Sequence, residues 1–211
     1  MLRLPFKIQQ LSSVFLFILV TISSSMATEP IKIMLYGDSL MAGYGLNQSE
    51  NLSTALQSRL DSDGIRARLI NASVSGNTSS NGLSRLEWSL GDEPDIVVLC
   101  LGANDMLRGL DPEQTKQNLE SIITITRQIG AKVILAGMNS PINMGAKYQQ
   151  QFDQVYPQLA RQYGLVFMPF LLDGVALNKK YLQKDFKHPN KLGIRIIANN
   201  LYPYILQAID K

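Results

Sequence analysis

The sequence predicts an α/β domain with three α/β/α layers, in which a five-stranded parallel sheet is covered by helices on both faces. Short apolar runs, typical of buried strands, alternate along the chain with longer amphipathic stretches, typical of helices. Such alternation forms βαβ units, whose crossovers are right-handed and whose strands run parallel. The five expected strands are 31–36, 67–71, 96–101, 132–137 and 165–168.

The stretches between these strands place apolar residues at the spacing of one helical face. Leu52, Leu56 and Leu60 follow one another at intervals of one helical turn in the first of them. Asp111 followed by Pro112 is typical of a helix start, because proline fits the first helical position. We expect helices over 52–60, 83–90, 111–130, 146–163 and 191–209.

The first 27 residues differ in character from the rest of the chain. A positively charged start is followed by the apolar run 11–22 and then by small residues that end at Ala27. This order of segments is typical of a secretory signal peptide. The alternative, a membrane anchor, needs roughly 20 apolar residues, more than this run contains. We therefore expect a signal peptide over 1–27, a single domain over 28–211, and a periplasmic or secreted bacterial protein.

Composition and charge exclude several classes of protein. The 20 Lys and Arg against 17 Asp and Glu give a formal net charge of +3, and no run of basic residues occurs. A balance this close to neutral argues against a nucleic-acid partner. Cys100 is the only cysteine, which excludes an intramolecular disulfide, and no second apolar run reaches the length of a membrane span. We expect a monomer without a stable membrane span, with Cys100 and the single tryptophan, Trp88, packed inside.

Polar clusters follow the predicted strands at the points where the strands end. In an open parallel sheet these carboxyl ends form one edge, and ligands bind beyond that edge. The clusters therefore belong to one candidate site, in which we interpret Asp38 and Asp105 as capping residues of the local turns. The clusters are Gly37-Asp38-Ser39, Ser75-Gly76-Asn77, Gly102-Ala103-Asn104-Asp105 and Asp185-Phe186-Lys187-His188.

His188 is the only histidine of the chain, and by itself it could be an exposed residue without a function. Asp185, three residues earlier, can accept a hydrogen bond from the ring and fix its tautomer. The other ring nitrogen is then free to act as a base toward Ser39, which becomes a nucleophile. Candidate donors to an oxyanion are the Ser39 N–H, the Gly76 N–H and the Asn104 side-chain amide. This set of groups is suited to acyl transfer.

Four short motifs together resemble the sequence blocks of the SGNH (GDSL) hydrolases. They are Gly-Asp-Ser-Leu at 37–40, the Gly76 block at 75–78, Gly-x-Asn-Asp at 102–105 and Asp-x-x-His at 185–188, in the family's order. The resemblance extends over most of the chain, and the chain is most similar to small bacterial periplasmic thioesterases, lysophospholipases and arylesterases. It implies a flavodoxin-like fold and a serine esterase or thioesterase that acts on small acyl esters or thioesters through an acyl-enzyme. It also implies that neither a metal nor an organic cofactor is needed.

The resemblance further implies a role for each residue of the site. Ser39 would be the nucleophile, and His188 would be the general base and then the general acid. Asp185 would orient His188, and the oxyanion hole would consist of the Ser39 N–H, the Gly76 N–H and Asn104.

Several apolar residues near these motifs are candidates for an acyl-binding groove, although the same residue types also suit a protein core. Phe186 stands where the family often has glycine, and we expect it at the mouth of the pocket. The candidates are Leu40, Met41, Leu107, Leu110, Ile142 and Phe186.

Other functions fit the sequence less well. An α/β-hydrolase needs Gly-x-Ser-x-Gly, and residues 37–41 lack the second glycine. No glycine-rich phosphate-binding motif follows the first strand, which argues against nucleotide binding. Two alternatives stay open: a carbohydrate-ester deacetylase of the same family, and a periplasmic acyl-binding protein that kept the fold and lost the chemistry.

Overall fold

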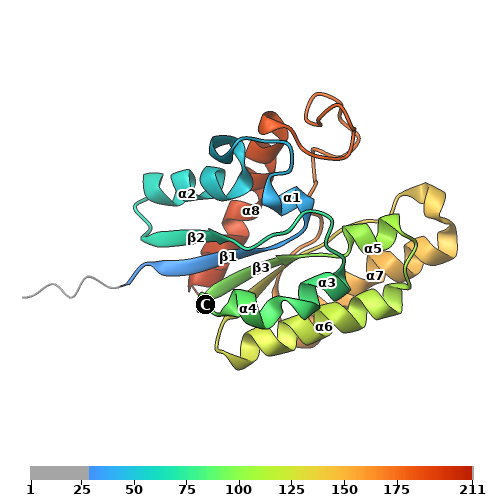
Figure 1. The fold of residues 1–211 in the computed structure, drawn as a ribbon, viewed down its shortest axis with the longest axis horizontal. Helices are drawn as coiled ribbons and strands as arrows, with labels where there is room; N and C mark the ends of the chain where they lie inside the picture. The colour runs from blue at the N-terminus through green and yellow to red at the C-terminus, as the bar shows by residue number, and fades with distance from the viewer. Residues whose placement is uncertain (1–28, 211) are drawn as a thin grey trace, which may run out of the picture.

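The computed structural model describes residues 29–210, so the signal peptide expected over 1–27 lies outside the described residues. The predicted architecture is confirmed. Five parallel strands form one sheet in the order β2-β1-β3-β4-β5, with helices on both faces (Figure 1). The strands are β1 (Ile31–Gly37), β2 (Ala67–Asn71), β3 (Ile96–Cys100), β4 (Lys132–Ala136) and β5 (Val166–Met168).

The central strands are buried because helices cover both of their faces. Every residue of β3 is buried, and so is the second part of β1, from Ile33 onward. Burial on both faces explains why these strands are continuous apolar runs rather than alternating ones. The register pairs Gly37 with Cys100, a buried residue as expected. The strands β1 and β3 therefore end side by side at one edge of the sheet.

Each face of the sheet has its own group of helices (Figure 1). The helices α2 (Leu52–Ser62) and α8 (Lys191–Asp210) pack together on one face, and α6 (Pro112–Gln128) and α7 (Ala146–Tyr163) pack together on the other. None of the helices within residues 29–210 combines the length and the apolar character that crossing a membrane requires. The short elements are α1 (Ser39–Ala42), η1 (Gln48–Glu50), α3 (Ser79–Ser84), α4 (Leu86–Leu90), α5 (Ala103–Leu107) and η2 (Ile142–Met144).

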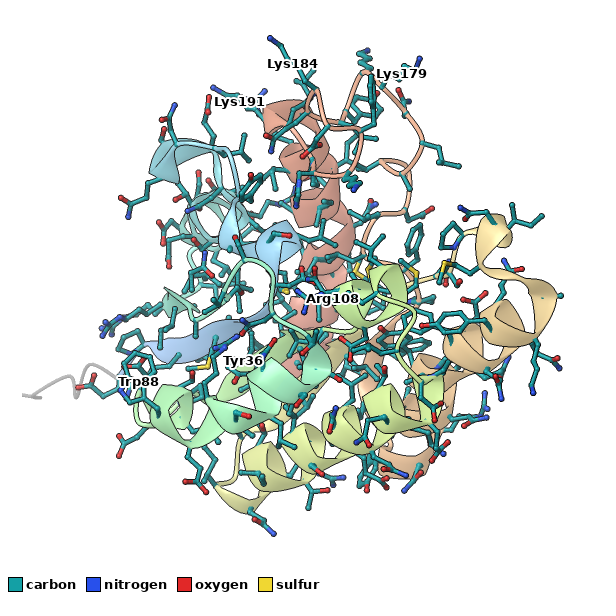
Figure 2. All side chains as sticks on the ribbon, turned by 45° about the vertical axis from the view of Figure 1, so that its right-hand side comes forward. Tyr36, Trp88, Arg108, Lys179, Lys184 and Lys191 are labelled. Carbon is teal, nitrogen blue, oxygen red and sulfur yellow. The ribbon has the colours of Figure 1, made fainter. Side chains whose placement is uncertain are left out.

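The region expected as one helix over 83–90 is instead divided between α3 and α4. Arg85 separates them with a φ of −106° and a ψ of 3°, outside the helical range. Leu86 and Leu90 are buried, whereas Trp88 is 86% exposed and extends outward (Figure 2). The expectation that Trp88 packs in the core is wrong, because a residue two positions from each of two core-facing leucines lies on the opposite side of a helix.

The connection from β5 to α8, residues 169–190, contains no helix or named strand but is held by hydrogen bonds. Leu182 and Pro189 form an isolated antiparallel bridge, and the Gln183 N–H donates to the His188 carbonyl over 2.8 Å. Figure 1 shows this segment, coloured orange to red, at the end of the molecule where α1 lies. The segment thereby carries the 185–188 cluster to the carboxyl ends of the strands.

Candidate active site

Ser39 is the first residue of α1, directly beyond the end of β1. Gly37 leaves the strand where a larger residue would not fit, since an added Cβ would lie 2.7 Å from the Cys100 carbonyl oxygen. Asp38 then caps α1, because its Oδ1 accepts a hydrogen bond from the Leu40 N–H over 3.0 Å. A tight turn made by Gly37 and Asp38 therefore presents Ser39 at the edge of the sheet.

His188 joins Ser39 and Asp185 in one hydrogen-bonded chain. Its Nε2 lies 2.8 Å from Ser39 Oγ, and its Nδ1 lies 2.6 Å from Asp185 Oδ2. The other oxygen of Asp185 accepts the backbone N–H groups of Lys187 and His188 at 3.0 and 3.1 Å. The hydrogen bond to His188, followed by these backbone bonds, lowers the pKa of Asp185 to about 2. The carboxylate is therefore charged at neutral pH and holds the ring with Nε2 facing Ser39.

Two of the three expected oxyanion donors are backbone groups without an acceptor. Within residues 29–210, neither the Ser39 N–H nor the Gly76 N–H donates a hydrogen bond. Gly76 has a φ of +82°, which side chains rarely adopt, and an added Cβ would meet no atom within 4 Å. The space beside Gly76 is therefore open. Its carbonyl accepts a hydrogen bond from the Arg108 guanidinium over 3.0 Å, which fixes this loop.

Asn104, the third expected donor, lies in the first turn of α5, beyond the end of β3. Its Nδ2 donates to the Asn77 carbonyl over 3.0 Å and to Asp38 Oδ2 over 3.2 Å. Both amide hydrogens are thus engaged. For Asn104 to bind an oxyanion, one of these two hydrogen bonds must be exchanged.

Residues 35–196 match the sequence model of the GDSL-like lipase/acylhydrolase family. The chain belongs to this family. The match covers most of the 211 residues and includes Ser39, Gly76, Asn104, Asp185 and His188. It confirms the resemblance found in the sequence and makes the chain a GDSL-type hydrolase.

Relatives of this GDSL-type hydrolase are similar to it over most of their length. Esterase TesA of Pseudomonas aeruginosa is 40% identical over 172 residues, which are 81% of this chain and 86% of that protein. Thioesterase 1/protease 1/lysophospholipase L1 of Escherichia coli is 35% identical over 186 residues, 88% of this chain and 87% of that protein. Among solved structures, TesA has a TM-score of 0.80 at 39% identity and covers 84% of this chain and 99% of its own. The psychrotrophic esterase EstA from Pseudoalteromonas sp. has a TM-score of 0.81 at 32% identity, with coverages of 85% and 99%.

In this GDSL-type hydrolase, Asp38 does more than cap a turn. It is buried, and its two oxygens join Leu40, next to the nucleophile, to Asn104. Burial raises the pKa of Asp38 to about 6, although the Leu40 N–H, the charge of His188 and the Asn104 amide act in the opposite direction. Because this carboxyl titrates near neutral pH, the hydrogen bonds by which Asp38 joins Leu40 to Asn104 depend on pH.

Asp105 is the centre of a buried hydrogen-bond network rather than a simple cap. Its carboxylate accepts hydrogen bonds from the Ser79 N–H over 2.8 Å, from the Ser79 hydroxyl and from the Thr115 hydroxyl over 3.3 Å. Asn118 in turn donates to the Ser79 hydroxyl over 2.9 Å. The network therefore fastens α5 to α3 and α6, and it fixes the position of Asn104, the residue that precedes Asp105.

Arg85 is a site residue that sequence reasoning missed. Its guanidinium donates to the Gly37 carbonyl over 3.2 Å, to the Ala72 carbonyl over 2.6 Å and to Asn77 Oδ1 over 2.6 Å. It also lies over the ring of Tyr36, 4.1 Å from the centroid. In the described part of the chain it pairs with no carboxylate. Arg85 therefore joins the turn before Ser39 to the loop that carries Gly76.

Tyr44 is a second residue that the sequence motifs did not indicate. Its ring lies 4.5 Å from the His188 ring, centroid to centroid, at a tilt of 39°. Its carbonyl accepts a hydrogen bond from Gln183 Nε2 over 2.7 Å. These contacts hold the 169–190 connection against the end of α1, so that the histidine reaches the serine. Gln183 and His188 lie five residues apart, and only the folded loop brings both to Tyr44.

The six candidates for an acyl-binding groove fall into two groups. Leu40 and Met41 are 7% and 0% exposed and belong to the core, so they offer little or no surface to an open groove. The hydroxyl of Tyr148 donates to the Leu110 carbonyl over 2.9 Å, so the loop after α5 lies beside the start of α7. Exposed side chains are found at Leu107, Leu110, Ile142 and Phe186.

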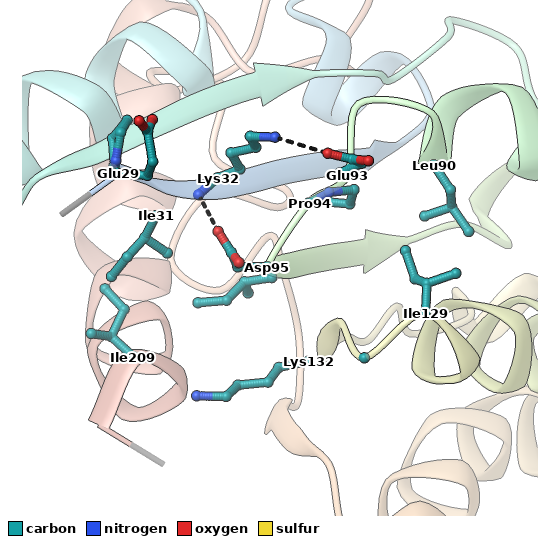
Figure 3. A pocket seen from close by; sticks show the side chains of 13 residues that line it. Glu29, Ile31, Lys32, Leu90, Glu93, Pro94, Asp95, Ile129, Lys132 and Ile209 are labelled. Atoms are coloured by element: carbon teal, nitrogen blue, oxygen red, sulfur yellow. Dashed lines mark hydrogen bonds and ion pairs between the residues drawn. The ribbon is translucent and has the colours of Figure 1, made fainter.

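A cavity of about 950 Å³ lies at the opposite end of the sheet (Figure 3). Its lining includes Ile31, Ile96 and Lys132, which begin three neighbouring strands. Across it, Lys32 pairs with Glu93 at 3.6 Å and its backbone N–H donates to Asp95 over 2.7 Å. Because Ser39 and His188 lie at the carboxyl ends of the strands, this cavity is separate from the candidate active site.

Proposed function

We propose that this chain hydrolyses carboxylic esters and thioesters through an acyl-enzyme formed on Ser39. The observation that carries the proposal is the hydrogen-bonded chain from Ser39 through His188 to Asp185. A free N–H on the nucleophile itself and another on Gly76 are suited to a developing oxyanion. Membership of a family of lipases and acylhydrolases supports the same class of reaction.

The geometry supports a two-step reaction. As Ser39 Oγ attacks the carbonyl carbon, His188 Nε2 takes the hydroxyl proton, and the carbonyl oxygen becomes the oxyanion of a tetrahedral intermediate. The intermediate collapses by breaking the bond to the alcohol or thiol, which leaves with the proton from His188. Water then loses a proton to the same nitrogen and attacks the acyl carbon. The bond from this carbon to Ser39 Oγ breaks, the proton passes from His188 to Oγ, and the carboxylic acid is released.

We infer that the substrates are small acyl esters and thioesters, including lysophospholipids, acyl-CoA and aryl esters. The names of similar proteins support this range: esterase, thioesterase and lysophospholipase occur in the names of two of them, and arylesterase is the name of a Vibrio mimicus protein 37% identical over 168 residues. Exposed apolar side chains at Leu107, Leu110 and Phe186 suit an acyl chain better than a sugar.

The two alternatives have weaker support. An acetyl xylan esterase and an acetyl-xylooligosaccharide esterase share the fold with this chain at 23% and 21% sequence identity, respectively. Identities this low support a common fold alone. An acyl-binding protein without activity would have no use for a histidine held 2.8 Å from Ser39 Oγ and bonded to a charged Asp185.

The hydrolase proposal is tested by labelling and by a substrate series. A fluorophosphonate should label Ser39 in the active protein, and Ser39→Ala should abolish both labelling and hydrolysis of p-nitrophenyl acetate. Rates on p-nitrophenyl esters of increasing chain length, beside lysophosphatidylcholine and palmitoyl-CoA, then define the substrate class. Active protein whose label maps to another residue would overturn the proposal.

We also propose an exported monomer without a nucleic-acid partner. The order of segments in residues 1–27 and the near-neutral charge support this. Mass spectrometry of the protein purified from a bacterial periplasm should find Thr28 as its first residue. A chain that retains residues 1–27 in the cell would contradict the export proposal, and a concentration-independent dimer mass in solution would contradict the monomer.

A further inference from the structure

Basic and apolar side chains gather on the β5–α8 connection, beside the catalytic histidine. We name this surface the cationic rim and propose that it binds the surface of an anionic phospholipid bilayer. Figure 2 shows Lys179 and Lys184 extending from the same end of the molecule as Lys191. The cationic rim consists of Leu177, Lys179, Lys180, Lys184, Phe186 and Lys187.

The charge of the protein is concentrated in this segment. Residues 177–187 contain four of the 20 Lys and Arg and one of the 17 Asp and Glu, which leaves 16 basic and 16 acidic residues elsewhere. The single carboxylate, Asp185, is bonded to His188. A chain of small net charge therefore has one positive end and a remainder without formal net charge. Near an anionic surface, this asymmetry orients the molecule with the cationic rim toward that surface.

The lysines of the cationic rim have no acidic partners. Among residues 29–210, no carboxylate oxygen lies within 4.0 Å of Lys179, Lys180, Lys184 or Lys187. Lys191, just beyond the rim, pairs instead with Glu50 at 3.0 Å. Lys179 and Lys180 lie over the rings of Phe186 and Tyr181, 5.4 and 5.5 Å from the centroids. Without a carboxylate partner, the lysines keep a charge that attracts phosphate groups, and their flexible side chains can adapt to mobile headgroups.

Two large apolar side chains are presented among these lysines. Leu177 is 98% exposed and Phe186 is 59% exposed. Their φ values are 63° and 55°, a left-handed conformation that is rare for bulky residues. The Leu182–Pro189 bridge encloses the turn that carries Phe186, and the Asn178 N–H donates to the Val175 carbonyl over 3.2 Å across the turn that carries Leu177. Both side chains thus extend outward, where another molecule can cover them.

The combination of groups favours a bilayer over other polyanions. Lysines that surround exposed Leu and Phe side chains are typical of segments that lie in the interface of anionic membranes, where apolar groups enter the acyl boundary and lysines contact headgroups. A nucleic acid offers no place for Leu177. Because His188 belongs to the same connection, docking through the cationic rim brings the catalytic histidine close to lipid. Binding goes beyond the proposed hydrolysis and does not depend on it.

Co-sedimentation with vesicles tests the inference. The full chain is mixed at low ionic strength with vesicles of phosphatidylcholine alone or of phosphatidylcholine with phosphatidylglycerol. The test variant is K179Q/K180Q/K184Q, and Leu177→Asn removes the apolar group at a conformation that Asn tolerates. The matched control is R66Q/R68Q/R161Q, which removes the same charge from exposed positions near the opposite ends of the strands. Every protein keeps the same N-terminus, so differences between them report on the mutated surface.

Wild type and the control should partition more strongly onto the anionic vesicles than onto the neutral ones. The triple lysine variant should lose on the order of 100-fold in anionic-vesicle partitioning, at about fivefold per lysine. Leu177→Asn should weaken partitioning while the preference for anionic lipid remains. Equal partitioning onto both vesicle types, or an equal loss in the arginine control, overturns the inference. Ser39→Ala should bind as wild type does, and hydrolysis of soluble p-nitrophenyl acetate by the lysine variant should be unchanged, so bilayer binding and hydrolysis are judged separately.

Discussion

Asp38 Oδ2 accepts a hydrogen bond from Asn104 Nδ2 over 3.2 Å, and this contact joins the end of β1 to the start of α5. The nucleophile follows Asp38 directly in the chain. One buried carboxyl therefore holds the turn of Ser39 and the side chain of an expected oxyanion donor at once. The protonation of Asp38 accordingly affects both stability and the site.

The raised pKa of Asp38 predicts a fall in stability with rising pH. The folded protein retains this proton up to about pH 6, whereas an unfolded chain releases it near 3.8. The stabilisation that Asp38 contributes is therefore fully present below pH 3.8 and is lost as the pH rises through about 6, and it amounts to about 3 kcal/mol for a shift of this size. Asp38→Asn removes the titrating group. The difference in the free energy of unfolding between wild type and this variant, measured with urea, should therefore change between pH 4 and 7. Asp111→Asn, at an exposed helix cap, should keep the wild-type slope. Parallel slopes for wild type and Asp38→Asn would contradict the prediction.

Arg85 is expected to act as a positioning residue. Arg85→Lys leaves one ammonium group in place of a guanidinium that bridges Gly37, Ala72 and Asn77. A small displacement of these segments should lower kcat on the order of 100-fold while KM changes little. The rate of fluorophosphonate labelling should fall in parallel.

Arg59 provides the control for Arg85. Its guanidinium also donates a hydrogen bond, to Asn199, and also lies over an aromatic ring, that of Tyr202, but between α2 and α8. Arg59→Lys should reduce the thermal midpoint without changing kcat. Equal kinetic effects of the two substitutions would show that Arg85 acts through global stability alone.

His188 and Asp185 should differ in their importance for the rate. His188→Ala removes the base and should lower kcat on the order of 10⁶-fold, whereas Asp185→Ala leaves a base that is only poorly oriented and should cost on the order of 10⁴-fold. The lowered pKa of Asp185, about 2, also means that its contribution to stability is present above 3.8 and is lost as the pH falls through 2. Steady-state kinetics of both variants on p-nitrophenyl acetate provide the measurement. A His188→Ala enzyme with wild-type rates would refute the assignment of the base.

Gly76 should be sensitive to substitution because of its backbone and its N–H. Gly76→Ala meets no neighbouring atom but forces a side chain into a φ of +82°, at a cost of about 1 kcal/mol. Relief of this strain would rotate the N–H away, and kcat should fall by up to about 100-fold, since one oxyanion donor is worth about 3 kcal/mol. Gly109→Ala is the control, because Gly109 has a similar φ, +63°, and an added Cβ there would also meet no atom within 4 Å. It should lose similar stability in urea unfolding yet keep its kcat, and a matching loss of kcat in both would argue against the oxyanion role.

The sequence was sufficient for the parts of the molecule that depend on local patterns. Apolar runs that end in Gly37-Asp38-Ser39 or Gly102-Ala103-Asn104 locate both the strands and the polar groups at their ends. Asp185 and His188 could be paired because they are three residues apart and the histidine is unique.

Contacts between distant segments were beyond this kind of reasoning. Arg85 binds carbonyls that follow two different strands, and nothing near it in the sequence indicates those partners. In the sequence, Asp105 looks like an ordinary capping residue of a helix. Its hydrogen bonds with Ser79 and Thr115 form only when α3 and α6 pack beside α5. Trp88 was misplaced because it lies two positions from both Leu86 and Leu90, whose side chains face the core, and therefore lies on the opposite side of α4.

The two halves of the active site are built on different kinds of structure. Ser39 and Asn104 are anchored to central strands of the sheet, whereas His188 and Asp185 belong to a connection held by one bridge and a few hydrogen bonds. Opening of that connection costs less than global unfolding. Hydrogen exchange at Gln183 should therefore be faster than in β3. A protease that cleaves after Lys179 or Lys180 would cut the chain between β5 and His188, and the base would then be held near Ser39 only by α8 and by the contacts of Tyr44 with His188 and Gln183.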